Sequence, residues 1–247
     1  MPDLRTKLRE RLLRTLQWVR AHKVWTGVII FSAWIVLEIV LLPYADVVRL
    51  KRTVPTETAF MRMHQEQAAD EGKAFKKVYR WVPFNRISRD AVNAVIVAED
   101  GTFWSHSGFD WFELRESIER NLSEGRPARG ASTITQQLAK NLYLSPSKNP
   151  LRKLREWILT WWMEQTLSKQ RILELYLNVI EWGRGIYGIE AASQTYFGKP
   201  ASALTREEGA RLAAVIPNPR MFRLDRETRY LQRRSRLILN RMAARGY

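Results

Sequence analysis

Apolar residues in this chain recur mostly with the spacing of α-helices. Val92, Val95 and Ile96 form one such helical face. Their helix is expected to reach Ala98 and to be capped at its start by the hydroxyl of Ser88. The same reasoning predicts a strand within 76–82, a helix that opens at Asp110, and helices over 130–141, 150–167, 168–178, 205–216 and 226–245. The pattern therefore predicts a mainly α fold.

Residues 24–42 form an apolar segment that is long enough to cross a membrane. They contain 15 apolar residues, and a helix of this length extends roughly 28 Å, about the thickness of the hydrocarbon core. Residues 1–23 carry seven Lys or Arg against two acids, so the positive-inside rule places them in the cytoplasm and the rest of the chain outside. A cleaved signal peptide is the alternative, but its apolar region would span only about 7–15 residues.

Charge and composition narrow the class of partner. The chain has 41 Lys and Arg against 25 Asp and Glu, a net charge of +16 and a pI near 10.5, which favours nucleic acid, an acidic membrane or a phosphorylated substrate. The ten tryptophans are typical of proteins at membrane interfaces. Because the chain has no cysteine, disulfides and thiolate metal sites are excluded.

Glu99 is the first candidate for catalysis. It lies three and four positions after Ile96 and Val95, so it continues an apolar helix face where the helix ends. Partial burial there should raise its pKa and suit it to act as a general base. The alternative is an ordinary charge at a helix end, although the helix dipole disfavours an acid at that position.

A second candidate site combines amides, hydroxyls and cations. In GASTITQQLAKN, residues 130–141, helical spacing brings four polar residues to one face: Thr133, Gln136, Gln137 and Lys140. Cations accumulate in the same region with no acid before Glu156: Arg126, Arg129, Lys140, Lys148, Arg152, Lys153 and Arg155. A helix start beside cations and amides suits phosphate together with sugar hydroxyls, so we expect a phosphorylated carbohydrate there. The alternative is a solvated surface.

Glu156 and the tryptophans near it each allow two interpretations. Glu156 lies four residues after Arg152 and three after Lys153. This spacing fits a surface salt bridge worth about 0.2–0.5 kcal/mol, or an acid that orients phosphate-binding cations or holds a metal ion. Core packing or a lipid-facing patch would explain three tryptophans on the same helix: Trp157, Trp161 and Trp162.

Three other patterns carry no site. GRGIYG at 183–188 spells G-x-G-x-x-G but follows a helical pattern instead of a strand, and SPSK at 145–148 lacks the further motifs of a transpeptidase. Both are therefore read as turns. The three histidines, His22, His64 and His106, are too scattered for a metal cluster.

Five segments occur in the order typical of one enzyme family: EDGTFWSHSG, GASTITQQLAKNLY, RKLRE, KQRILELYLNVIEWG and ARLAAVIPNP. Over roughly residues 75–225 the chain resembles the peptidoglycan glycosyltransferases, the glycosyltransferase module of class A penicillin-binding proteins. The resemblance implies a mainly α, lysozyme-like domain with a membrane-dipping small lobe, beside the single transmembrane helix. The resemblance divides the chain into five parts. They are a basic cytoplasmic segment (1–23), a transmembrane helix (24–42), a connector (43–74), the glycosyltransferase domain (75–225) and a basic helix packed on that domain (226–247).

The resemblance also implies an activity and a location. Family members polymerise lipid II into β-1,4-linked glycan strands, with inversion, from an undecaprenyl-pyrophosphate-linked donor. The expected partners are these lipid-linked substrates, the membrane and proteins of cell-wall synthesis or division, and not nucleic acid. The chain would then be anchored once in the bacterial inner membrane, with its N-terminus in the cytoplasm and its catalytic domain in the periplasm.

Site residues follow from the matching motif positions. Glu99 resembles the general base and Asp100 its motif partner, and the rest of that motif is expected to shape the site: Phe103, His106 and Gly108. The donor-cleft helix corresponds to Ser132, Thr133, Gln136, Gln137, Lys140 and Asn141. Pyrophosphate binding and activation correspond to Arg152, Lys153 and Glu156. Three further matches are expected to be structural: Glu174, Tyr176 and Asn178. Lys148 departs from the pattern, because many family members have Arg at this position. Lysine keeps the positive charge but cannot bind a phosphate in the bidentate way that arginine can.

Cofactors and alternative functions remain open at this point. The resemblance allows a divalent cation, Mg²⁺ or Mn²⁺, at the pyrophosphate, with its ligands unknown, and implies no organic cofactor. A lysozyme-like hydrolase with Glu99 as general acid is one alternative, although it would not need the cation cluster. A non-enzymatic, membrane-tethered binder of nucleic acid or acidic lipid is the other.

Overall fold

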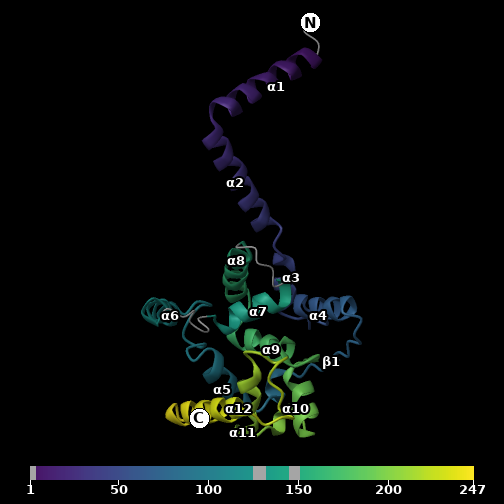
Figure 1. Ribbon diagram of the computed structural model, residues 1–247, viewed down its shortest axis with the longest axis vertical. Helices are drawn as coiled ribbons and strands as arrows, with labels where there is room; N and C mark the ends of the chain where they lie inside the picture. Colours follow the sequence, from purple (N-terminus) through teal and green to yellow (C-terminus); the bar gives the residue numbers. More distant parts are fainter. Residues whose placement is uncertain (1–3, 125–131, 145–150) are drawn as a thin grey trace. The chain divides into compact units, whose positions relative to one another are not determined.

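The computed structural model describes residues 4–124, 132–144 and 151–247, and these are mostly helical (Figure 1). The predicted mainly α class is confirmed. The chain divides into two compact units, Met1–Leu42 and Pro43–Tyr247, and each is considered by itself.

The first unit contains two helices, α1 (Leu4–Ala21) and α2 (Lys23–Val40). The segment Lys23–Arg49 includes a window with a mean hydropathy of 2.2, of which 6% is buried, and is long and apolar enough to cross a membrane. The apolar helix predicted over 24–42 is therefore confirmed as an element. Its exposed apolar surface fits membrane anchoring.

The second unit is built from ten α-helices and a small sheet in the described residues. The helices are α3 (Tyr44–Arg49), α4 (Ala59–Asp70), α5 (Arg89–Glu99), α6 (Trp111–Glu124), α7 (Ile134–Tyr143), α8 (Leu151–Thr166), α9 (Lys169–Val179), α10 (Ile189–Phe197), α11 (Arg206–Val215) and α12 (Arg229–Ala244). The strands are β1 (Val78–Tyr79), β2 (Glu181–Gly183) and β3 (Ile186–Tyr187), in the order β1-β3-β2. β3 pairs parallel to β1 and antiparallel to β2.

The GRGIYG segment forms the turn between β2 and β3, as predicted. Gly185 has φ +76°, and a Cβ there would lie 2.4 Å from the carbonyl oxygen of Lys76. Glycine is required at this position because the neighbouring backbone leaves no room for a side chain. The motif therefore has a structural explanation and no nucleotide site.

Two groups of packed helices position the site. α5 packs against α11 and α12, while α7 packs against α4, α8 and α9. Figure 1 shows α7 and α8 at one end of this unit, α11 and α12 at the other, and α9 between them. Close approach of α5 and α11 depends on Gly209, where a Cβ would lie 2.7 Å from the Cα of Ala91. Hydrogen bonds from Gln137 to Glu99 and from the N–H of Ile134 to Asp100 join the C-terminal end of α5 to α7.

Side-chain caps start several helices where they were expected. Ser168 accepts a hydrogen bond from the backbone N–H of Arg171, and Thr205 forms a capping box with Glu208. The cap predicted for Ser88 is wrong. Ser88 does precede α5, but its hydroxyl donates to the carbonyl oxygen of Leu204 at 2.7 Å, so a tertiary contact replaces the local one.

Candidate active site

Glu99 is the last residue of α5, and its side chain is only 11% exposed. One carboxylate oxygen accepts a hydrogen bond from Gln137 Nε2 at 3.0 Å, and the other from Arg234 Nη2 at 3.2 Å. Burial raises the pKa of Glu99, against the opposing effects of Gln137, Arg234 and Lys140. Burial thus shifts the pKa in the direction expected from the sequence, and a role of Glu99 as general base stays a prediction.

Tyr176 fixes the orientation of the Gln137 side-chain amide by binding its oxygen. This tyrosine of α9 is fully buried, and its hydroxyl donates to Gln137 Oε1 at 2.9 Å. The amide nitrogen is thereby directed at Glu99. This contact agrees with the structural role expected of Tyr176 and shows that its hydroxyl orients a residue bound to the candidate base. Asn178 and Glu174 do act structurally: they bind the backbone of the segment before α5, at Val82 and Phe84.

Arg234 is a site residue that the sequence analysis missed. It lies on α12, on the same face as the buried Leu231 and Ile238. An arginine within an apolar helix face indicates a buried acidic partner, and this signal was available in the sequence. Its Nε is buried and has no hydrogen-bond partner among the described residues. A second arginine near the end of the chain, Arg245, donates to the carbonyl oxygen of Gly101 at 2.8 Å.

Lys140 lies one helical turn beyond Gln137 on α7. Burial lowers the pKa of Lys140, and the nearby cations Arg152 and Lys153 act in the same direction. The carboxylates of Glu156 and Glu99 oppose this effect, so the ammonium group feels both acids. The ammonium group of Lys140 is therefore within electrostatic range of both Glu99 and Glu156, which the sequence placed in separate motifs.

Glu156 of α8 is buried and binds two cations of its own helix. Arg152 Nη1 lies 3.1 Å from one carboxylate oxygen, and the ammonium group of Lys153 contacts the other. The side chains of Arg152 and Lys153 are 28% and 43% exposed. The salt bridges expected from this spacing are present, but the acid is buried while the cations stay accessible, so they are not ordinary surface pairs. The alternative, an acid that orients cations toward an anion, stays a prediction.

Polar residues at the start of α7 serve the fold more than an open cleft. Thr133 and Gln136 are buried and form a reciprocal capping box, and Thr133 also donates to the carbonyl oxygen of Gly108 at 2.7 Å. Ser132 precedes this cap, and its carbonyl oxygen lies 3.4 Å from Gln137 Nε2. The four residues predicted to share one polar face thus divide into two that build the helix and two that reach Glu99.

Asp100 is buried and ties the loop after Glu99 to the start of α7. Its carboxylate accepts hydrogen bonds from the backbone N–H of Ile134 at 2.9 Å and from His106 Nε2 at 2.9 Å. The other imidazole nitrogen accepts from the N–H of Gly108 at 3.0 Å. We therefore place Asp100 among positioning residues and not among those that contact substrate.

Two remaining predictions complete the placement of site residues. Asn141 Nδ2 donates to the carbonyl oxygen of Gln137 at 2.8 Å, along α7. Lys148 lies outside the described residues, as do Arg126 and Arg129. Their expected part in anion binding stays a prediction.

The tryptophans of α8 are mostly at the surface. Trp157 and Trp161 are exposed, which makes the core-packing interpretation wrong for both. Trp162 is half-buried and its indole nitrogen lies 3.4 Å from the carbonyl oxygen of Tyr44. The exposed pair agrees with the lipid-facing alternative.

The two carboxylates near Lys140 do not form a site that fits a divalent ion. Glu99 and Glu156 each already pair with at least one cationic side chain. Among residues 4–124, 132–144 and 151–247, no group of three or more His, Cys, Asp or Glu is arranged to hold a metal ion. A divalent ion held mainly by pyrophosphate oxygens needs only one or two protein ligands, so the Mg²⁺ or Mn²⁺ that the resemblance allowed stays a prediction.

A buried carboxylate at the end of α5 and a second buried carboxylate that binds two accessible cations on α8 make up the candidate site of this helical domain. The family model described as Transglycosylase matches residues 66–243, and the chain therefore belongs to the transglycosylase family of glycosyl-transferring enzymes.

Relatives share most of the chain and one name, biosynthetic peptidoglycan transglycosylase. A protein of Nitrosospira multiformis is 42% identical over 217 residues, which cover 88% of this chain and 91% of the relative. One of Neisseria gonorrhoeae is 40% identical over 234 residues, covering 94% and 96%. One of Thiobacillus denitrificans is 47% identical over 192 residues, covering 77% and 82%.

Proposed function

We propose that this enzyme polymerises lipid II into peptidoglycan strands at the outer face of the bacterial inner membrane. The donor is a growing glycan linked to undecaprenyl pyrophosphate, and the acceptor is the N-acetylglucosamine of an incoming lipid II. The names of the relatives and the match to the Transglycosylase model support peptidoglycan as the product of the reaction. The arrangement around Glu99 supports the chemistry.

Glu99 acts as the general base in this proposal. Its carboxylate removes the proton of the acceptor 4-hydroxyl as that oxygen attacks C1 of the donor N-acetylmuramic acid. The bond from C1 to the pyrophosphate oxygen breaks, and the new β-1,4 bond has inverted configuration. A raised pKa brings the base closer to the working pH, where proton transfer contributes about 10²–10⁴-fold to the rate.

The cations supported by Glu156 receive the leaving group. Lys140, Arg152 and Lys153 supply positive charge where the pyrophosphate gains negative charge. Because the buried Glu156 already orients Arg152 and Lys153, little reorganisation is needed during the reaction. Arg234 favours the ionised form of Glu99, the form that can accept the proton of the acceptor.

Membrane attachment fits a lipid-linked substrate. The apolar α2 would anchor the chain, with the basic N-terminal segment in the cytoplasm and residues after Pro43 in the periplasm. Exposed Trp157 and Trp161 lie on α8, the helix that carries the cation cluster, and would contact the outer leaflet beside it. The polyprenyl chain could then stay in the bilayer while its pyrophosphate reaches Arg152.

The observation that carries the proposal is the buried Glu99, bound by Gln137 and Arg234 and electrostatically coupled to Lys140. The test compares the full-length wild type with Glu99→Gln and with Glu66→Gln, an exposed acid on α4. Each is incubated in vesicles with lipid II, and the products are separated on gels. We expect strands from the wild type and Glu66→Gln, and at least about a hundredfold loss for Glu99→Gln without loss of thermal stability.

Two outcomes would reject this assignment. Polymerisation by Glu99→Gln at the wild-type rate would show that Glu99 is not the general base. Release of fragments from finished peptidoglycan, without growth of strands from lipid II, would make the enzyme a hydrolase with Glu99 as its acid.

A further inference from the structure

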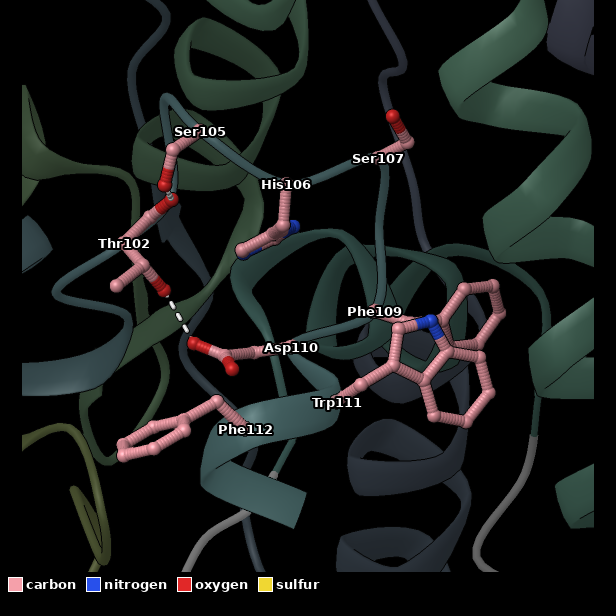
Figure 2. Close-up of a pocket in the computed structure, with 8 residues that line it drawn as sticks. All are labelled: Thr102, Ser105, His106, Ser107, Phe109, Asp110, Trp111 and Phe112. Atoms are coloured by element: carbon pink, nitrogen blue, oxygen red, sulfur yellow. Dashed lines mark hydrogen bonds between the residues drawn. The ribbon is translucent and has the colours of Figure 1, made fainter. Parts of the chain in front are cut away.

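A groove of about 480 Å³ lies on the segment that joins α5 to α6, a few residues beyond Glu99 (Figure 2). This volume falls within the roughly 300–1,000 Å³ of small-molecule sites. Its lining side chains are neutral, aromatic or acidic: Thr102, Ser105, His106, Ser107, Phe109, Asp110, Trp111 and Phe112. The reaction described above uses none of them.

One side of the groove is polar. The hydroxyl of Thr102 donates to the carboxylate of Asp110, and Figure 2 shows this bond across the groove. Burial would raise the pKa of Asp110, but the bonds from Thr102 and from the backbone N–H of Glu113 outweigh it, so the pKa is lowered and the group is ionised at neutral pH. Ser105 and Ser107 add hydroxyl groups that can exchange hydrogen bonds with the hydroxyls of a ligand, whereas both ring nitrogens of His106 are already bonded within the protein.

The other side is aromatic. The ring of Trp111 stacks on Phe109, with centroids 5.5 Å apart and an angle of 24° between the planes. Trp111 is nevertheless 66% exposed, so its second face is open. Phe112 is exposed as well and extends to the opposite side of Asp110 in Figure 2. A flat aromatic face beside an acid and hydroxyls can stack on the C–H face of a sugar while the polar groups bind its hydroxyls.

The charge of the groove separates ligand classes. None of its eight lining residues is Lys or Arg, and Asp110 is ionised, so a phosphate would be repelled. A lipid chain would remove water from the carboxylate of Asp110 without replacing its hydrogen bonds, which is costly. An uncharged, hydroxyl-rich ring meets neither obstacle.

We propose that this groove is a saccharide subsite, which binds an N-acetylhexosamine unit of the glycan with Trp111 as its stacking platform and Asp110 as its hydrogen-bond acceptor. The proposal rests on the function proposed above and extends its substrate contacts. His106 lines the groove and binds Asp100, the residue that follows Glu99 in the chain, so the groove and the candidate base belong to the same loop region. Both Trp111 and Asp110 would position substrate and take no part in proton transfer.

The direct test measures binding of N-acetylchitotetraose, a soluble and uncharged oligosaccharide, to the full-length protein by ligand-observed NMR. The variants are Trp111→Ala and Asp110→Asn, and the asparagine can still cap α6. Trp161→Ala is the control, because it removes another exposed tryptophan, which lies outside the groove. We expect affinity to fall about five- to tenfold in both groove variants and to stay unchanged in the control.

A kinetic measurement separates this subsite from a lipid contact. With lipid II as substrate, Trp111→Ala should raise KM by about the same factor in vesicles and in detergent, with little change in kcat. Loss of activity only in vesicles, and to the same extent in Trp161→Ala, would mean that Trp111 contacts lipid and would overturn the proposal. Equal binding of the tetrasaccharide by all proteins, or by none, would overturn it too. Each of these results leaves polymerisation by the wild type intact, whereas failure of the proposed function would abolish that polymerisation itself.

Discussion

The guanidinium group of Arg234 lies 3.2 Å from the carboxylate of Glu99, although 135 residues separate them along the chain. α12 therefore completes the site instead of serving only as a basic surface helix. The pair is partly shielded, since the carboxylate is 11% exposed and the guanidinium 26%. The main consequence of this ion pair is that it lowers the pKa of Glu99 and so favours the ionised carboxylate.

Replacing Arg234 with Gln should move the acid limb of the kcat profile to higher pH. Arg234 lowers the pKa of Glu99 against the larger effect of burial, so its removal raises that pKa further and the base loses its proton only at higher pH. We expect the variant to lose about tenfold more activity at pH 6 than at pH 9. Arg234→Lys keeps the charge and should stay near the wild-type profile. Arg233→Gln, an exposed neighbour, is the control, and an unshifted limb in Arg234→Gln would contradict the coupling.

Replacing Tyr176 with Phe should lower kcat by about three- to tenfold, in line with one lost hydrogen bond. The change frees the Gln137 amide, which then no longer directs its nitrogen at Glu99. In a double-mutant cycle with Gln137→Ala the two effects should not add, because Tyr176 acts through Gln137. Tyr187→Phe removes another buried hydroxyl, bound to His64 at 2.8 Å, and should leave kcat unchanged. Additive effects in the cycle would show that Tyr176 acts by another route.

Arg152→Ala should reduce polymerisation by at least about tenfold, and Lys140→Ala should do likewise, because each removes charge from the leaving-group site. Initial rates with lipid II measure this. Arg89→Ala changes an exposed arginine at the start of α5 and serves as the control. If the two site variants kept the wild-type rate, the pyrophosphate would have to bind elsewhere.

Gly108→Ala should destabilise the fold by about 2 kcal/mol or more. Its φ of +90° is unfavourable for alanine, and a Cβ would lie 2.8 Å from Glu164 Cγ and 2.9 Å from Thr160 Cγ2. Gly198→Ala is a matched control, since Gly198 also has positive φ but has open space around it, and should cost about 1 kcal/mol. Urea unfolding of both variants measures the difference. Equal losses of stability would show that α8 moves aside without cost.

The features that the sequence predicted correctly are those set by neighbours along the chain. The caps at Ser168 and Thr205 need only the next turn of helix, and the burial of Glu99 follows from its place after Val95 and Ile96. Local spacing failed where a distant segment competes. Ser88 binds the carbonyl oxygen of Leu204 instead of capping α5, and nothing in its own helix indicates that acceptor.

The site itself was only partly predictable for the same reason. Helical spacing grouped Thr133, Gln136, Gln137 and Lys140 correctly on α7, but it did not distinguish a capping box from a cleft wall. That distinction depends on Gly108 and Asp100, which pack against the start of α7. The role of Arg234 depends on how α12 packs on α5, a contact between helices that lie far apart along the chain.

The long separation between Glu99 and Arg234 also has a consequence for biosynthesis. Glu99 is synthesised well before α12 and acquires its arginine only after that helix has been made and has packed on α5. A chain that ended before α12 would therefore carry the carboxylate without the cation that favours its ionised form.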